Sequence, residues 1–439
     1  NGEGVEVNYQ EAIKYFKMAM NKGNSNATFS YALLFYEGNG VPVDKIIAAK
    51  FLKKAADNGC IKAMGIYSQM LYKGDGIPIN KIEAAKYLKM KADSGDLDSQ
   101  NSYAIINLNG DGIPVNNQIA LKYFKMAADN GSPIGMHNCG VIFYGGIGIS
   151  VNKKEAAKYY KMSADKGFPN AIDRYSVMCY WGDGIPVDKI EAAKYFKLGA
   201  DIGYSPSVFN YAVILHKGEG VKTNKKESLK YFKKDADDNN NPVSMTCYAY
   251  WLDHDEPSND ENKKEVIKYY RMAIDKNNYD AISHYGRLLQ KGDGIPMDKE
   301  KALHYYKIGI DNNVSDAMLY YGEMLQDGDG IETNKNEAIK YFKMAIDKKN
   351  TDAMLHYAKM LHKGIDVDVN IEEAIKYYKM SIDNGNDDAM FCYGKMLEEG
   401  DGINVNKEEA IKYYKMAAEK ENINASNALR LLTKNDKLE

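Results

Sequence analysis

An aromatic residue recurs along the chain at a nearly constant interval, and this periodicity constrains the fold more than any other feature. It occupies twelve positions: Tyr15, Phe51, Tyr87, Tyr123, Tyr159, Tyr195, Tyr231, Tyr269, Tyr305, Tyr341, Tyr377 and Tyr413. Every step is 36 residues long except the step from Tyr231 to Tyr269, which is 38. A period in this range predicts a solenoid, in which each unit buries its apolar face against its neighbours.

The residues before each of these aromatic markers predict a capped helix. Seven residues earlier, all twelve copies have Asn or Asp, and Glu follows three residues after it in nine copies. The side-chain oxygen of Asn or Asp accepts hydrogen bonds from the free amides of a first helical turn, and the added Glu resembles a capping box. The predicted caps are Asn8, Asp44, Asn80, Asn116, Asn152, Asp188, Asn224, Asn262, Asp298, Asn334, Asn370 and Asn406.

Each repeat is predicted to contain a second helix, and two kinds of turn connect the helices. The marker helix should end at a residue that tolerates the left-handed conformation, such as Gly131 or, in other copies, Asn239, Asn277 and Asn313. A helix rich in small residues follows, as in 317–325, and a Gly-x-Gly loop such as 328–330 leads to the next cap. Each repeat is therefore predicted to consist of a helix, a turn, a second helix and a loop, which gives an all-α fold.

This combination of features resembles the Sel1-like repeat family, which is related to tetratricopeptide repeats. Residues 74–90, from Gly74-Asp75-Gly76-Ile77-Pro78 to Lys86-Tyr87-Leu88-Lys89-Met90, are a representative copy, and the resemblance covers essentially the whole chain. It implies a right-handed αα-superhelical solenoid of about twelve 36-residue helix-turn-helix repeats that serves as a scaffold or adaptor for protein complexes. The resemblance supplies no catalytic residues.

The repeat pattern predicts one solenoid domain over residues 1–439. We expect a partial first repeat at 1–26, eleven repeats at 27–424 and a terminal half-repeat or cap at 425–439. Because the chain opens inside a repeat, we expect either a monomeric array or, more simply, a part of a longer protein.

One segment departs from the pattern. Residues 253–262 replace a Gly-x-Gly loop with a longer acidic insert, whose acidic residues are Asp253, Asp255, Glu256, Asp260 and Glu261. The loop at 364–366 also lacks its second glycine.

Composition argues against several functional classes. Lys plus Arg total 58 and Asp plus Glu total 61, so the net charge of −3 lacks the basic excess of a nucleic-acid-binding protein. No apolar run is long enough for a membrane span in this portion, and no signal peptide is visible. The five cysteines have no disulfide or zinc spacing, which favours reduced thiols and a cytoplasmic location.

Candidate chemical motifs have structural explanations. The Gly-Asp-Gly loops lack the preceding strand and third glycine of a phosphate-binding loop, so we interpret them as turns. A calcium loop at 183–188 is rejected because Lys194 occupies the position of the required Glu. The seven histidines are too widely spaced to share a metal ion, and the recurring lysines alternate with acidic residues that neutralise them. We therefore predict no catalytic, cofactor-binding or metal-binding residues.

The positions most informative about function are those that vary on the first helix of each repeat. One row comprises Leu33, Gln69, Ile105, Val141, Val177, Val213 and Ala249, followed by Arg287, Glu323, Lys359 and Lys395. A second row comprises Tyr36, Tyr72, Leu108, Tyr144, Tyr180, His216 and Leu252, followed by Gln290, Gln326, His362 and Glu398. Both rows change from apolar to polar near residue 285, and an apolar strip on a solenoid indicates a partner site.

We predict that the apolar part of these rows binds other proteins, as a peptide or helix in the concave groove. The candidate partner-binding residues are Tyr36, Tyr72, Leu108, Val141, Tyr144, Val177, Tyr180, Trp181, Val213 and His216. The alternative is that the rows belong partly to the core.

The sequence favours a non-enzymatic scaffold or adaptor, with the acidic insert giving a preference for basic partners. The alternative is a regulatory or targeting tail of an enzyme, such as a protein kinase, whose catalytic domain precedes residue 1. Replacing Tyr72, Tyr144 and Tyr180 by Ser is expected to abolish partner capture.

Overall fold

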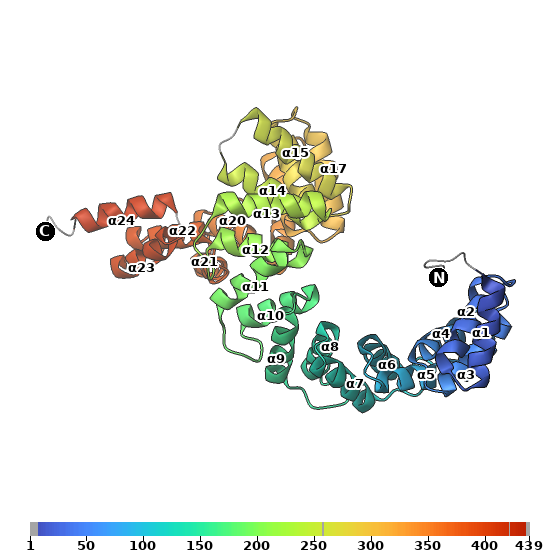
Figure 1. Cartoon of the computed structure of the whole chain (residues 1–439). Helices are drawn as coiled ribbons and strands as arrows, with labels where there is room; N and C mark the ends of the chain where they lie inside the picture. The colour runs from blue at the N-terminus through green and yellow to red at the C-terminus, as the bar shows by residue number, and fades with distance from the viewer. Residues whose placement is uncertain (1–7, 257–258, 421, 436–439) are drawn as a thin grey trace. The chain divides into compact units, whose positions relative to one another are not determined.

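The protein is built from helices and turns. A computed structural model describes residues 8–256, 259–420 and 422–435, and these residues form helices without any β-strand (Figure 1). This confirms the predicted all-α class. The chain divides into two compact units, residues 1–228 and residues 229–439.

The helices have similar lengths throughout. In the first unit they are α1 (Tyr9–Asn21), α2 (Ser25–Glu37), α3 (Lys45–Asp57), α4 (Ile61–Lys73), α5 (Lys81–Asp93), α6 (Leu97–Asn109), α7 (Asn117–Asp129), α8 (Pro133–Gly145), α9 (Lys153–Ala164), α10 (Pro169–Trp181), α11 (Lys189–Asp201) and α12 (Ser205–Lys217). The division between the units falls inside α13 (Lys225–Asp238).

The second unit continues the alternation. Its helices are α14 (Pro242–Asp255), α15 (Asp260–Ile274), α16 (Asp280–Lys291), α17 (Lys299–Asp311), α18 (Ser315–Asp327), α19 (Lys335–Asp347), α20 (Thr351–Lys363), α21 (Ile371–Asp383), α22 (Asp387–Glu399), α23 (Lys407–Ala418) and α24 (Ile423–Asn435).

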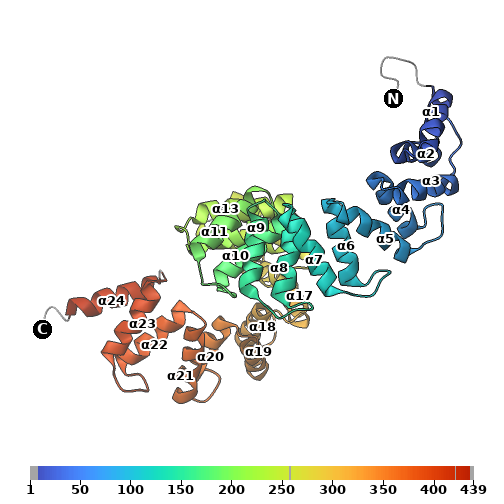
Figure 2. The ribbon, with the colours of Figure 1, turned by 60° about the horizontal axis from the view of Figure 1, so that its bottom comes forward.

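Within each unit the helices form two layers. The odd-numbered helices carry the periodic aromatic marker, and each even-numbered helix packs against the odd-numbered helices next to it in the chain, as α8 does with α7 and α9 (Figure 2). Even-numbered helices of adjacent repeats also touch, for example α10 with α12 and α16 with α18. The even-numbered helices therefore form a continuous face in each unit.

The core combines small residues with edge-to-face aromatic pairs. In α3, Ala48, Ala55 and Ala56 are fully buried, which lets neighbouring helices approach closely. In repeats throughout the described part of the chain, a ring on the even-numbered helix meets the marker ring of the following helix, with centroids 4.7–5.3 Å apart. This T-shaped geometry is the one that the ring quadrupoles favour. The marker therefore repeats because it fills the space between the two helices of a repeat.

The predicted helix caps are confirmed at eleven of the twelve positions. There the Asn or Asp side chain accepts a hydrogen bond, 2.9–3.1 Å long, from the amide three residues later. The prediction is wrong for Asn262, because α15 begins earlier and Asn259 is its cap, accepting at 2.9 Å from the Asn262 amide.

The cap departs from a standard capping box in one respect. The backbone N–H of Asn80 donates to the carbonyl of Leu71 at 2.8 Å, and that of Asn334 donates to Leu325 at 2.8 Å. The Glu of the box cannot receive that proton, so it accepts instead from the side-chain amide of the cap, as Glu337 does from Asn334 at 3.0 Å. Asn suits this cap because it both accepts and donates.

The Gly-x-Gly turns join successive repeats. Gly74 and Gly76 have φ angles of 73° and 76°, and a Cβ atom on Gly76 would lie 2.2 Å from the Cβ of Lys45 in the preceding repeat. The second glycine is therefore required by a contact between repeats as well as by its backbone conformation. In the loop at 364–366, Asp366 takes the left-handed conformation with φ 60°.

The turns after the marker helices are mostly as predicted. Asn277 and Asn313 have φ angles of 59° and 62°, but the prediction for Asn239 is wrong, because Asn240 is the left-handed residue there with φ 56°. The helix α13 is one residue longer than most of its counterparts, with 14 residues, and this displaces the turn.

The two extra residues near 253–262 are therefore not inserted at a single place. One precedes Tyr248, whose ring pairs with Tyr269 as its counterparts do in other repeats, and the other follows it. Leu252 is buried like Leu215 and Leu289, with 6%, 4% and 3% exposure. The predicted rows are wrong at this repeat: Tyr250 and Asp253 occupy the positions assigned to Ala249 and Leu252.

Candidate partner-binding face

The face formed by the even-numbered helices carries all ten candidate partner-binding residues of the first unit. Tyr72, Tyr144 and Trp181 are exposed, with 38%, 38% and 72% of their surface accessible. The other seven are half-buried: Tyr36, Leu108, Val141, Val177, Tyr180, Val213 and His216. These residues border the surface but also take part in packing.

The four tyrosines of the second row have a structural role that the sequence analysis missed. Each donates its hydroxyl to an acidic residue in the next Gly-x-Gly loop. The pairs are Tyr36 with Asp75 at 2.8 Å, Tyr72 with Asp111, Tyr144 with Asp183 at 2.6 Å, and Tyr180 with Glu219. A lysine at the start of the intervening odd-numbered helix binds the same carboxylate, as Lys81 binds Asp111 at 2.6 Å. The three residues form a tie between adjacent repeats.

The charges in this tie support one another. The Lys81 ammonium and the Tyr72 hydroxyl hold the pKa of Asp111 below its usual value. Lys153 and Tyr144 do the same for the pKa of Asp183. The aspartate of the Gly-Asp-Gly loop is therefore an acceptor for contacts between repeats, which agrees with the interpretation of these loops as turns.

One repeat replaces the whole tie with other residue types. Leu108 stands where the tyrosine would be, Ile147 where the acid would be and Asn117 where the lysine would be. Leu108 and Ile147 pack against the same core cluster, so an apolar contact substitutes for the polar one. This joint change at a spacing of 39 residues is the sequence signal that would have revealed the tie.

In the second unit an amide or imidazole takes the place of the phenol. Gln290 donates to Asp329 at 2.8 Å, and Gln326 donates to Asp366 at 2.8 Å. The imidazole of His362 lies 3.1 Å from Asp401. The change near residue 285 from aromatic to polar residues in the second row therefore preserves one structural contact.

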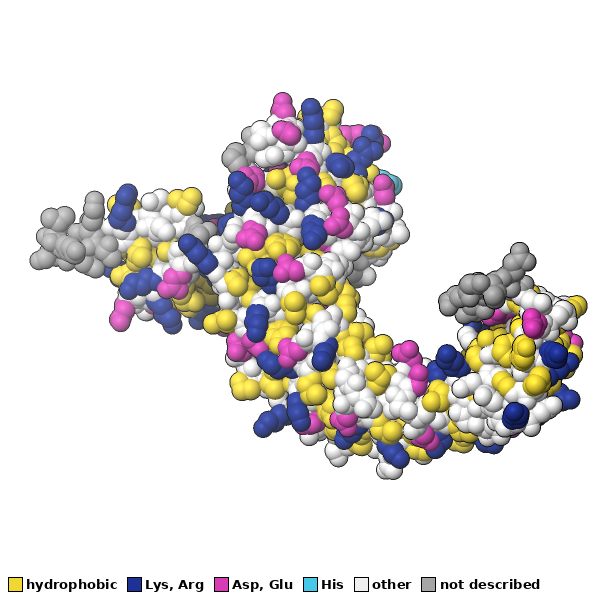
Figure 3. Space-filling view, viewed as in Figure 1, with side chains coloured by type: hydrophobic (Ala, Val, Ile, Leu, Met, Phe, Trp, Pro, Cys, Tyr) yellow, Lys and Arg dark blue, Asp and Glu magenta, His cyan; other side chains and the backbone are white. Residues whose placement is uncertain are grey.

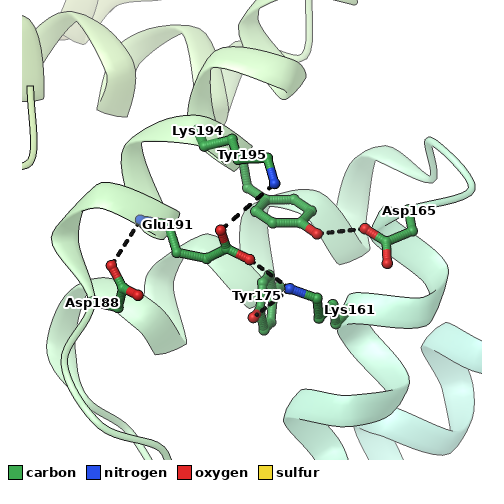
Figure 4. Close-up of polar contacts among 7 residues, drawn as sticks. All are labelled: Lys161, Asp165, Tyr175, Asp188, Glu191, Lys194 and Tyr195. Atoms are coloured by element: carbon green, nitrogen blue, oxygen red, sulfur yellow. Dashed lines mark hydrogen bonds and ion pairs between the residues drawn. The ribbon is translucent and has the colours of Figure 1, made fainter.

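A second recurring network joins successive odd-numbered helices and the even-numbered helix between them (Figure 4). Lys161 lies between Glu191 at 2.5 Å and the hydroxyl of Tyr175 at 3.3 Å, while Tyr195 donates to Asp165. Burial raises the pKa of Tyr175 to about 12, so it remains a neutral phenol at ordinary pH. Positive and negative side chains are interspersed over the face shown in Figure 3, as expected for lysines that have acidic partners.

The face of the even-numbered helices is hollowed in both units. In the first unit a groove of about 450 Å³ lies between α4 and α6 above α5, and Tyr72, Leu88 and Ile105 line it. In the second unit a larger cavity of about 640 Å³ is formed by α14, α16, α18 and α20, and Tyr250, His284 and Tyr320 line it.

The acidic insert lies beside the larger cavity and is mostly helical. Asp253 and Asp255 belong to α14, and Asp253 pairs at 2.5 Å with Lys263, which also pairs with Asp293 at 2.6 Å. Glu256 is the C-cap of α14, and Asp260 and Glu261 lie in the first turn of α15, where the helix dipole favours carboxylates. Part of the negative charge of the insert is therefore used in ion pairs and at helix ends within this region.

The five cysteines are unpaired, and Cys60, Cys139 and Cys179 are buried. Among the described residues, no three His, Cys, Asp or Glu side chains are grouped so that they could hold a metal ion. In the same part of the chain, every helix is too short or too polar to cross a bilayer.

Comparisons with known proteins agree with this architecture. The family model described as "Sel1 repeat" matches eleven segments: 1–24, 25–60, 61–96, 97–132, 133–168, 169–204, 205–240, 280–314, 315–350, 351–386 and 387–422. One unmatched stretch, residues 241–279, covers α14 and α15, where the repeat departs from the regular period. No curated protein matches the chain in sequence.

A solved structure of low sequence identity has the same fold. A protective antigen of uropathogenic Escherichia coli, c5321, which displays an SLR fold, is 20% identical with a TM-score of 0.73, covering 98% of this chain and 91% of its own. A Sel1 repeat protein from Oxalobacter formigenes is 18% identical, covers 87% of this chain and 89% of its own, and has a TM-score of 0.35. Yeast Tom70 is 12% identical, covers 98% and 96%, and has a TM-score of 0.41.

Proposed function

The chain belongs to the Sel1 repeat family, whose fold generally serves as a scaffold for protein interactions, and from this we propose that it is a non-enzymatic scaffold that binds a partner polypeptide on the face of its even-numbered helices. The groove between α4 and α6 carries this proposal. Its lining leaves apolar surface exposed, and exposed apolar surface of this kind marks an interaction site.

The groove is suited to an apolar segment of a peptide or an amphipathic helix. Ile105, with 42% of its surface exposed, lies on one wall, and the ring of Tyr72 lies on the other. Because the Tyr72 hydroxyl is fixed by Asp111, its ring loses little freedom on binding, which favours affinity. The remaining apolar residues of the rows, including Trp181, would extend this surface along the array.

The ties change how the surface should be tested. Replacing Tyr72, Tyr144 and Tyr180 by Ser would remove three hydrogen bonds between repeats, so a loss of capture would not separate binding from stability. A substitution at an exposed residue outside the ties avoids this ambiguity, and Ile105 is such a residue.

The test is affinity capture with the purified full chain. Ile105→Asp places a charge in the groove and should remove most of the partner captured by the wild type, because desolvating an unpaired carboxylate opposes binding. Ile82→Asp is the matched control: Ile82 is 71% exposed on α5 and lies outside the groove. Equal capture by the Ile105→Asp variant and the control would contradict the proposal.

A further inference from the structure

The cavity of the second unit differs chemically from the groove of the first. It is formed by four successive even-numbered helices, α14, α16, α18 and α20, and encloses about 640 Å³. Three of its lining residues, Asp280, Asp316 and Asp352, occupy the same position in consecutive repeats. The six first-unit helices have Asn26, Lys62, Asp98, Ile134, Asn170 and Pro206 at that position. The column of carboxylates therefore belongs to the second unit.

These carboxylates are held by neutral groups. The side-chain amide of Asn350 donates to Asp316 at 2.6 Å, and that of Asn386 donates to Asp352 at 2.8 Å. Within the described ranges, no Lys, Arg or His side chain forms an ion pair with Asp280, Asp316 or Asp352. Burial, and then the neighbouring charge of Asp316, raise the pKa of Asp352. Although Lys291 also lines the cavity, the three carboxylates carry negative charge that no ion pair among the described residues neutralises.

An imidazole in the cavity provides another acceptor. His284 is largely buried between the rings of Tyr250 and Tyr270, whose centroids are 5.1 and 5.7 Å away. Its ring nitrogens form no hydrogen bond with any described residue. Burial lowers the pKa of His284, so near neutral pH the ring is uncharged and one nitrogen can accept.

The chain already places one guanidinium at the edge of this cavity. The guanidinium of Arg287 lies over the ring of Tyr320, 4.6 Å from the centroid, and pairs with Glu323 at 2.6 Å. Glu323 offsets the charge of Arg287, so this arginine leaves the three aspartates uncompensated. The arrangement also shows that an aromatic wall of the cavity accommodates a flat cation.

We propose that this cavity binds the guanidinium of an arginine from a partner polypeptide, between the carboxylates of Asp316 and Asp352. The inference rests on the proposed function and specifies the chemistry of one partner residue. An arginine fits better than a lysine because its planar group offers five donors to two carboxylates, an imidazole nitrogen and the rings. The volume also leaves room for the peptide backbone next to the arginine.

The position of Trp251 allows a direct test on the full chain. The chain has two tryptophans, and Trp251 lines the cavity, so Trp181→Phe leaves a single fluorescent reporter there. The probes are acetyl-Gly-Arg-Gly-amide and its citrulline counterpart, which keeps the shape of arginine without the charge. We expect a saturable change in Trp251 emission with the arginine peptide, and a dissociation constant at least about tenfold higher for the citrulline peptide, because charge-assisted hydrogen bonds are lost.

The cavity variant replaces the carboxylates while preserving their shape. In the Trp181→Phe background, Asp316→Asn with Asp352→Asn should raise the dissociation constant of the arginine peptide by at least about tenfold. Asp388→Asn is the matched control, since Asp388 continues the same column outside the cavity lining, and it should change the constant by less than about twofold. Circular dichroism establishes that each variant is folded.

Equal binding of the two peptides by the folded Trp181→Phe protein would overturn the proposal, as would undiminished arginine binding by the folded double variant. If the double variant fails to fold, the peptide comparison on the Trp181→Phe protein still decides the question. Ile105→Asp should leave peptide binding unchanged. If the two peptides bind equally but Ile105→Asp still loses partner capture, only the cavity proposal is overturned. If the arginine peptide is preferred but Ile105→Asp and its control capture equal amounts of partner, only the groove proposal is overturned.

Discussion

At the scale of the residue, Tyr72 shows how one side chain serves two purposes. Its ring lines a groove, while its hydroxyl joins its own repeat to the next loop through Asp111. Gln290 and Gln326 make the same contact without a ring. The apolar-to-polar change along the second row therefore alters the surface but retains a donor. From the sequence, only the hydrophobicity of this position was considered, so the hydrogen bond was missed.

His137 makes stability depend on pH. Burial lowers the pKa of its imidazole to about 4, from an ordinary value of 6.5, and rings of Tyr160 and Phe168 lie beside it. The unfolded chain therefore binds the proton more readily than the folded chain, and stability is lost as the pH falls from about 6.5 towards about 4.

The expected result is a difference in pH dependence. At about pH 5 the protonation of His137 in the unfolded chain should lower the free energy of unfolding by on the order of 2 kcal/mol. His137→Phe should remove this loss while retaining the ring packing. Thermal melts of wild type and variant at about pH 7 and about pH 5 measure it. His304→Phe, at an exposed position on α17, serves as the control and should retain the wild-type dependence. Parallel pH profiles for wild type and His137→Phe would refute the assignment.

At the scale of the element, prediction was accurate for features that depend on residues close to one another in the sequence. Eleven caps were predicted because a cap and the amide that it binds are three residues apart. The cap of α15 was missed because α15 has 15 residues and begins three residues earlier relative to Tyr269 than the marker helices of the other repeats. Where one helix ends and the next begins depends on packing between helices, which a pattern fixed to one marker does not include.

The caps give a prediction for a single helix. Asn334→Ala removes both the acceptor for the Glu337 amide and the donor to the Glu337 side chain, and should cost about 1 kcal/mol of local stability. We expect hydrogen exchange in the first turn of α19 to become about fivefold faster. Asn336→Ala removes the same side chain from an exposed position two residues later in α19 and should not accelerate exchange. Unchanged exchange in Asn334→Ala would show that the cap contributes little.

The cavity was harder to predict than the caps. The acidic insert drew attention to this region, but Asp253 pairs with Lys263, and the uncompensated carboxylates come from three other helices. The period does align Asp280, Asp316 and Asp352, yet sequence alone does not show which aligned residues face a hollow or have partners. Whether the first-unit rows bind a partner, and whether a catalytic domain precedes the array, remain predictions.

At the scale of the whole molecule, stability should be local. Each repeat contacts mainly its neighbours, so the loss of one core residue should weaken nearby repeats and leave distant ones intact. Phe342 is fully buried and packs against Gly322, so Phe342→Ala should cost about 3–5 kcal/mol.

Hydrogen exchange along the chain measures this spread. In Phe342→Ala, exchange should accelerate in α18, α19 and α20 while α4, α5 and α6 keep their wild-type rates. Tyr15→Ala, at a position with 58% exposure, is the control and should leave α18–α20 unchanged. Uniform acceleration along the whole chain would instead indicate a single cooperative unit.

The ties between repeats also bear on how such an array changes length. Tyr36 meets Asp75, and Tyr72 meets Asp111, at the same separation of 39 residues. Excising residues 37–72 would therefore bring Tyr36 to that separation from Asp111, while Lys81 would keep its own pair with Asp111. The shortened chain should still unfold cooperatively in a thermal melt. Because these contacts recur at a fixed sequence separation, such genes could gain or lose whole repeats by unequal recombination without any change in the residues that join neighbouring repeats.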